Sequence, residues 1–149
     1  MSSAYKSYEY DSEIGYDTKY ILKNVVQELH EYNSKQNGWK IFPLKEGAFG
    51  FDNLVISICY TLNKVKTKEE LNDKNLEKLA DYVHRAWIKN YIYWRDNEPW
   101  KIGNYIKSAK PLNDKNRNIL AETKYEDLPE EEKNKDRIIA KFIKEKFTK

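Results

Sequence analysis

The feature that most constrains the fold is a long apolar repeat in the middle of the chain. From residue 76 to residue 94, apolar side chains recur every three or four positions, and charged residues fill most of the intervening ones. This spacing places side chains on one face of an α-helix, whereas a strand would alternate every second residue. It predicts an amphipathic helix that begins at Asp73 or Asn75 and ends near Trp94. The apolar positions are Leu76, Leu79, Ala80, Val83, Ala86, Trp87, Tyr91 and Trp94.

Three other segments carry helical signals. Residues 18–35 have apolar side chains on one face, and residues 51–65 are almost continuously apolar as far as Leu62, which predicts a buried helix. The last helix is expected to start near Pro129, with acidic residues in its first turn and lysines at its end. Thr67 followed by Glu70 is the pattern of a capping box, which predicts a short helical turn there.

The segments between these helices carry turn and loop signals. Residues 39–44 are expected to be extended, and the alternative of one short strand or hairpin near 39–44 stays open. Pro99 disfavours helical conformation at Glu98, so a linker should follow the long helix. Residues 119–121 are expected to form a short helical turn.

Composition supports an all-α fold. The chain has 149 residues, 34% of them charged, with only five glycines and four prolines, a balance that suits helices better than a turn-rich sheet. This length fits one domain with a core of its own. We therefore expect a compact single-domain helical bundle over residues 1–149, with residues 1–16 as an N-terminal arm.

Several classes of protein are disfavoured. The single cysteine, Cys59, lies in an apolar run and cannot form a disulfide within the chain. The first residues lack the apolar core of a signal peptide, and no window has the length of a transmembrane segment. These features predict an intracellular, cytoplasmic protein without a membrane partner. The net charge of +3 arises from interspersed signs and does not favour nucleic acid as a partner.

The sequence contains no common catalytic or cofactor motif. Phosphate loops, GxGxxG, HExxH and CxxC are all missing from it. The two histidines, His30 and His84, fall on different predicted helices, which favours structural or surface roles over metal binding. Glu130, Glu131 and Glu132 are adjacent and would fan outwards from a helix instead of converging as an acid–base pair. We therefore expect a non-enzymatic protein with no cofactor and no metal.

The stretch from Trp87 to Arg95 interleaves aromatic and basic residues. Such residues can stack nucleotides or bases through their rings and guanidinium groups. On a helix these aromatic residues fall on more than one side, so some must belong to the core. Core packing is the favoured role for Trp87 and Trp94.

Four short motifs resemble the ryanodine-receptor repeat (RyR) domain over about residues 76–146. Residues 79–87 (LADYVHRAW) are similar to the opening helix of the repeat, and residues 125–137 (YEDLPEEEKNKDR) to its closing signature. Between them, residues 100–103 resemble a Gly-Trp-x-x-Gly element, and residues 114–117 its charged loop. The chain departs from the pattern by an insertion near 93–97, by Pro99 in place of a glycine, and by Ile119-Leu120 in place of His-Pro.

This resemblance implies a helical module that recognises a nucleotide or a nucleotide-derived signal, as stand-alone microbial and viral members are thought to do. It implies that Trp100 is the stacking platform. The expected neighbours are Trp87, His84, Arg95, Arg117 and Tyr125. Each has a structural alternative: His84 could cap a helix or face solvent, Arg117 could be a solvated charge, and Tyr125 could pack under the last helix.

The leading hypothesis is thus a non-enzymatic ligand-binding module that senses or sequesters a small nucleotide-like molecule. A protein–protein interaction module is the alternative, because exposed aromatic residues can dock a protein partner. Binding of single-stranded nucleic acid through the basic aromatic stretch is a third hypothesis.

Overall fold

A computed structural model describes residues 25–45, 47–65, 67–101, 105–107 and 113–148. The described part contains five α-helices and four short 3-10 turns, and no strand occurs in it. The all-α prediction is confirmed, and residues 39–44 are extended without forming a strand or hairpin. The predicted N-terminal arm and residues 18–24 of the first predicted helix lie outside the described residues. The helices are α2 (Val26–Asn37), α3 (Phe49–Lys64), α4 (Leu76–Asn97), α5 (Lys115–Ala121) and α6 (Glu130–Phe147).

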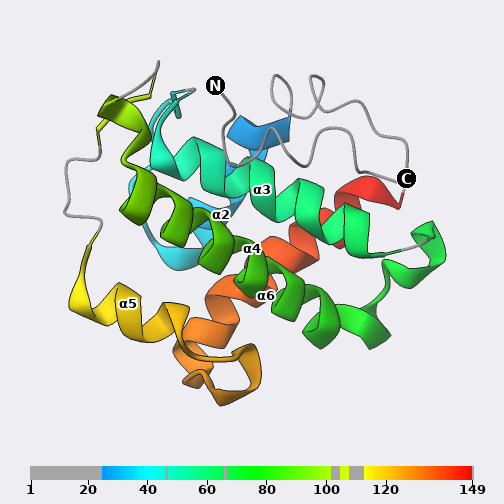
Figure 1. Ribbon diagram of the computed structural model, residues 1–149. Coiled ribbons are helices and arrows are strands. Elements are labelled where there is room, and N and C mark those ends of the chain that lie inside the picture. Colours follow the sequence, from blue (N-terminus) through cyan, green and yellow to red (C-terminus); the bar gives the residue numbers. More distant parts are fainter. Residues whose placement is uncertain (1–24, 46, 66, 102–104, 108–112, 149) are drawn as a thin grey trace.

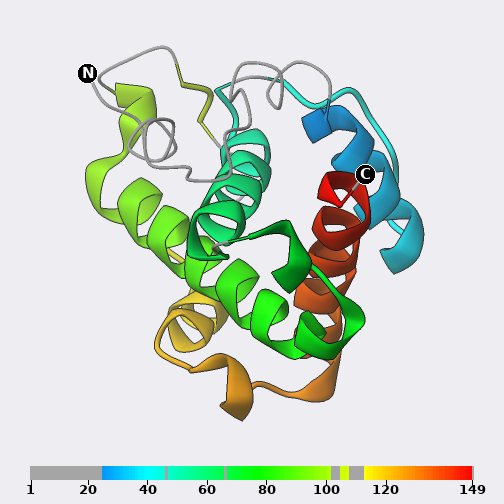
Figure 2. The same ribbon diagram turned by 90° about the vertical axis from the view of Figure 1, so that its right-hand side faces the viewer.

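Helix α4 lies at the centre of the bundle. It packs against α3 on one side and α6 on the other, while α2 contacts both α3 and α6 (Figures 1 and 2). The short helix α5 packs near the C-terminal half of α4, on the side away from α3 (Figure 1). The apolar stripe predicted for α4 forms part of one continuous core with residues of α2, α3 and α6. None of the described helices is long and apolar enough to cross a lipid bilayer.

The helix ends differ from the predictions in ways that local chemistry explains. Helix α4 continues three residues past Trp94, and the chain then leaves it at Glu98, whose φ of 44° is left-handed, just before Pro99. The capping box is confirmed, because the Thr67 backbone N–H donates to Glu70 Oε2 at 3.0 Å. The last helix begins at Glu130, with Pro129 directly before it. The predicted turn at 119–121 belongs to the longer helix α5.

A buried hydrogen bond joins α3 to α4. Trp94 Nε1 donates to Asp52 Oδ2 over 2.7 Å, and both side chains are fully buried. Asp52 Oδ1 finds no partner among the described residues. Burial raises the pKa of the Asp52 carboxyl to about 7, although the Trp94 hydrogen bond acts in the opposite direction.

This raised pKa predicts a decline in stability with pH. Folded Asp52 keeps its proton up to about pH 7, whereas unfolded Asp52 ionises near 3.8. The folded state therefore binds more protons, and stability should fall as the pH rises from about 4 to about 7. Asp52→Asn keeps an acceptor for Trp94 and cannot ionise. We expect the melting temperature of Asp52→Asn, relative to wild type, to rise between pH 5 and pH 8.

The control for this experiment is Asp73→Asn. The Asp73 carboxyl is exposed, and its hydrogen bond to Lys144 lowers its pKa, so its contribution has the opposite sign and is lost in acid. Parallel pH profiles for wild type and Asp52→Asn would contradict the assignment of Asp52.

Candidate functional site

A cavity of about 600 Å³ opens beside the middle of α4. Its walls come from α2, α3, α4, α5 and α6, and from Trp39 in the extended segment after α2. This volume lies within the range of small-molecule sites. The polar and aromatic residues that line it are Asn33, Trp39, Asn53, Ser57, His84, Trp87, Arg117, Glu132, Lys135 and Asp136.

Three aromatic rings form a ladder along α4. The rings of Trp87 and Tyr91 are nearly parallel, with centroids 5.0 Å apart, and those of His84 and Trp87 are also parallel, with centroids 6.1 Å apart. The residues are spaced by three and four positions, which places them on one face of the helix in the order His84, Trp87, Tyr91. Trp87 is half-buried and Tyr91 fully buried, so the ladder joins the cavity wall to the core.

His84 ties this wall to the loop after α5. Its Nε2 lies 2.7 Å from the Thr123 carbonyl oxygen. Because a carbonyl oxygen can only accept a hydrogen bond, Nε2 carries the proton and donates it to Thr123. Its Nδ1 faces Asp136 Oδ2 at 3.7 Å. Burial lowers the pKa of His84, and burial, with Glu132 nearby, raises the pKa of Asp136 to about 8. Burial therefore favours the uncharged form of each of these two side chains.

Two basic side chains contribute to the cavity. Lys135 on α6 lies 3.1 Å from Glu132, which also lines the cavity. Arg117 comes from α5, whose first turn is capped by Asp114 through the Arg117 backbone N–H at 3.4 Å. The cavity thus combines rings, amide and hydroxyl groups, the carboxyl groups of Glu132 and Asp136 and two basic side chains, a set that can bind a planar polar ligand with an anionic group.

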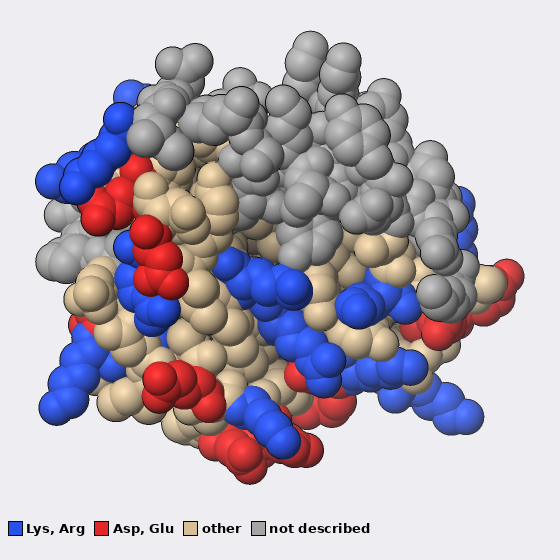
Figure 3. Space-filling model, viewed as in Figure 1, with Lys and Arg blue, Asp and Glu red and all other residues tan. Residues whose placement is uncertain are grey.

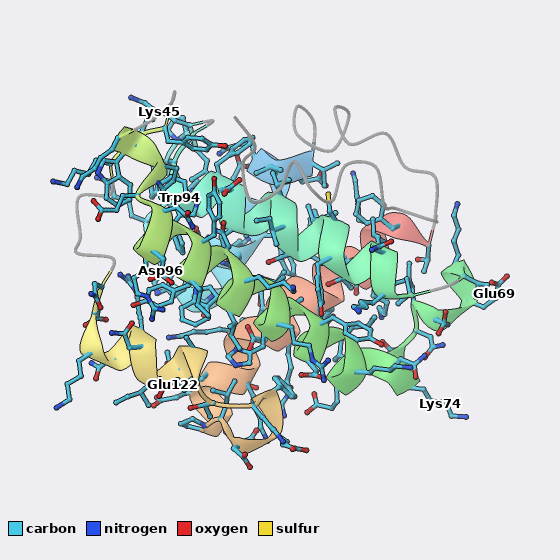
Figure 4. All side chains as sticks on the ribbon, in the orientation of Figure 1. Lys45, Glu69, Lys74, Trp94, Asp96 and Glu122 are labelled. Atoms are coloured by element: carbon cyan, nitrogen blue, oxygen red, sulfur yellow. The ribbon has the colours of Figure 1, made fainter. Side chains whose placement is uncertain are left out.

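The structure brings three of the six predicted site residues together in this cavity: His84, Trp87 and Arg117. Trp100, the predicted platform, is not in its lining and packs against the ring of Trp94, with centroids 5.9 Å apart. Figure 4 shows Trp94 near the C-terminal end of α4.

Arg95 and Tyr125 are used elsewhere. Arg95 Nε donates to Asp96 at 2.8 Å, and its guanidinium lies over the Tyr91 ring. Tyr125 is buried and donates to Glu77 Oε1 at 3.0 Å, which matches the structural alternative for this residue.

Four of the fourteen residues that line the cavity lie outside the RyR-like region and were not predicted from the sequence. Asn33, Trp39, Asn53 and Ser57 all precede residue 76. One signal could have pointed to them: Asn53 and Ser57 are polar residues within an otherwise apolar helix.

Comparisons with known proteins found no match, either among protein-family models or in searches of curated proteins and solved structures. In the described parts of the chain, no group of three or more His, Cys, Asp or Glu side chains is placed to hold a metal ion.

We expect His84→Ala to lower the free energy of unfolding by about 2 kcal/mol, because the Thr123 carbonyl loses its donor and a buried ring is removed. His84→Gln can keep an N–H donor and should lose less. Urea denaturation of both variants measures the difference. Equal losses would show that the hydrogen bond to Thr123 contributes little.

Proposed function

We propose that this protein is a non-enzymatic ligand-binding module whose cavity takes a nucleotide or a nucleotide-derived signal. The observation that carries the proposal is convergence: His84 and Trp87 on α4, and Arg117 on α5, line one cavity although about thirty residues separate them in the sequence. The RyR resemblance implies ligand contacts for the same three residues. A module that binds such a ligand without converting it would act by sensing or sequestering it.

The chemistry of the cavity suits such a ligand. A nucleotide needs aromatic surface for its base, hydrogen-bonding groups for the base edge and sugar, and cations for its phosphate. Trp39 and Trp87 supply rings, Asn53 an amide, and Arg117 and Lys135 the cations.

One observation favours a protein–protein interaction module as the second candidate. Trp39, Ile41 and Phe42 are each about half exposed and follow one another closely in the extended segment after α2. Exposed apolar side chains in such a cluster are typical of docking surfaces.

The structure gives less support to single-stranded nucleic acid. Tyr91 and Trp94, two rings of the basic aromatic stretch, are fully buried and cannot stack on bases. On the face shown in Figure 3, acidic side chains lie beside many of the basic ones. Other basic side chains adjoin one another across the centre of the same face, so burial of Tyr91 and Trp94, and not surface charge, is what disfavours nucleic acid.

Thermal unfolding against a panel of adenine and guanine nucleotides, cyclic dinucleotides and ADP-ribose derivatives tests the proposal. A ligand at a hundred times its dissociation constant should stabilise the fold by about 2.7 kcal/mol. Arg117→Ala should lose this stabilisation, because it removes a cation from the cavity. Trp100→Ala should melt earlier than wild type and still respond to the ligand, because Trp100 packs on Trp94 outside the cavity.

A folded wild-type protein that responds to nothing in the panel would refute the nucleotide proposal. The interaction module would then become the leading candidate. A shift that Arg117→Ala retains in full would place the binding site elsewhere on the protein.

A further inference from the structure

We propose that Trp39 and Asn53 recognise the ring of the ligand: Trp39 stacks on its face, and Asn53 Oδ1 accepts a hydrogen bond from an N–H group on its edge. The ligand class is then a planar nitrogen heterocycle with an N–H donor, such as an aminated purine. This inference rests on the proposed function and adds to it the part of the ligand that is recognised. Both residues precede the RyR-like region.

Trp39 offers an aromatic face at the cavity. Its side chain is 51% exposed although it lines the cavity, and it makes no ring contact with another described residue. Its backbone is held in place, because its N–H donates to the Ser34 carbonyl at 2.8 Å. Further along the same segment, the side chain of Gln27 on α2 makes two hydrogen bonds to the backbone. It donates to the Phe42 carbonyl at 3.2 Å and accepts from the Leu44 N–H at 2.8 Å. The segment therefore presents Trp39 from a fixed backbone.

Trp87 is less suited to stacking on a ligand face. It lies between His84 and Tyr91 in the ring ladder of α4, and both neighbours are nearly parallel to it. Rings in such an arrangement cover part of one another's faces. Trp87 is therefore a wall of the cavity, and Trp39 is the ring with surface left for a ligand.

Asn53 supplies a hydrogen-bond acceptor without a partner. Its Oδ1 is buried and, of the described polar atoms that are buried and unpartnered, it is the one whose residue lines this cavity. The neighbouring hydroxyl of Ser57 already donates to the Asn53 backbone carbonyl at 2.9 Å. A buried acceptor left unpaired is unfavourable, so a ligand N–H that reaches it gains a hydrogen bond at little cost.

Together these two groups define the ligand class. A flat ring placed on Trp39 can turn its edge towards α3, where Asn53 lies. The same cavity lining contains the basic side chains of Arg117 on α5 and of Lys135 on α6, the latter 3.1 Å from Glu132. In Figure 1, α3 lies above α4 and α5 below it, and the cavity lining includes Asn53 from α3 and Arg117 from α5. Sites that bond a polar group of the ligand discriminate strongly against analogues that lack it.

The test compares AMP with purine riboside 5′-monophosphate, which has the same ring and phosphate but no amino group, by calorimetric titration of the intact protein. Wild type should bind AMP about tenfold more tightly than purine riboside 5′-monophosphate, a difference in binding free energy of about 1.4 kcal/mol. Asn53→Ala should bind both ligands equally, at the weaker level. Trp39→Ala should lose about tenfold for both ligands, because stacking contributes to each. The matched control is Ile41→Ala, a truncation at an equally exposed position of the same segment outside the cavity lining.

The failures are distinguishable. If wild type binds both ligands equally, or if Trp39→Ala and Asn53→Ala bind AMP as wild type does while Arg117→Ala does not, the inference is wrong and the proposed function stands. If wild type binds neither ligand but responds to another member of the thermal panel, Trp39→Ala and Asn53→Ala are titrated with that ligand. The inference fails if both variants bind it as wild type does, and the proposed function again stands. Both fail if nothing in the panel binds. Melting curves verify that each variant is folded.

Discussion

Burial of the apolar face of α4 is the constraint on which the other elements depend. Helices α3, α5 and α6 and the turns η4 (Asp73–Asn75) and η6 (Tyr125–Asp127) all contact α4, and α2 completes the bundle through α3 and α6. His84 and Trp87 lie at the edge of the apolar stripe, so the packing that forms the core also fixes the cavity wall. Fold and candidate site are therefore two consequences of one helix.

The polar groups at the α3–α4 interface make this packing selective. Asp52 and Trp94 are both fully buried, and their hydrogen bond forms only when the two helices are aligned in one register. A shift by one turn would leave a buried indole N–H and a buried carboxyl unpaired, at a cost of several kcal/mol. Asn90, one turn before Trp94, is also fully buried, and its amide finds no partner among the described residues. These buried polar groups thus lower the stability of the interface, but they fix the register between α3 and α4. The cavity depends on that register, because both helices contribute to its lining.

Periodicity allowed α4 and α6 to be predicted, because a helix that buries one face must repeat apolar residues every three or four positions. Helix α3 was predicted from the length of its almost continuous apolar run. Periodicity did not predict the last residue of α4. Pro99 disfavours helical conformation only at Glu98, and the helix continues to Asn97, the residue before it. Short motifs selected His84, Trp87 and Arg117, which line one cavity, but they also selected Trp100, which lies outside its lining and packs on Trp94. A motif specifies a residue type and a spacing, whereas only tertiary packing decides which side a ring faces.

Tertiary packing also determines how much of the chain is needed to form the cavity. The RyR-like segment, about residues 76–146, supplies α4, α5 and most of α6, but α4 buries its apolar face partly against α3. Without residues 25–65, that face would meet water, and the cavity would lose the wall that holds Trp39, Asn33, Asn53 and Ser57. The RyR-like segment alone would then expose a core surface and lack the part of the cavity lining that precedes residue 76. The unit that can bind a ligand must therefore include α2, α3 and the extended segment between them, because the cavity exists only where these elements close over α4, α5 and α6.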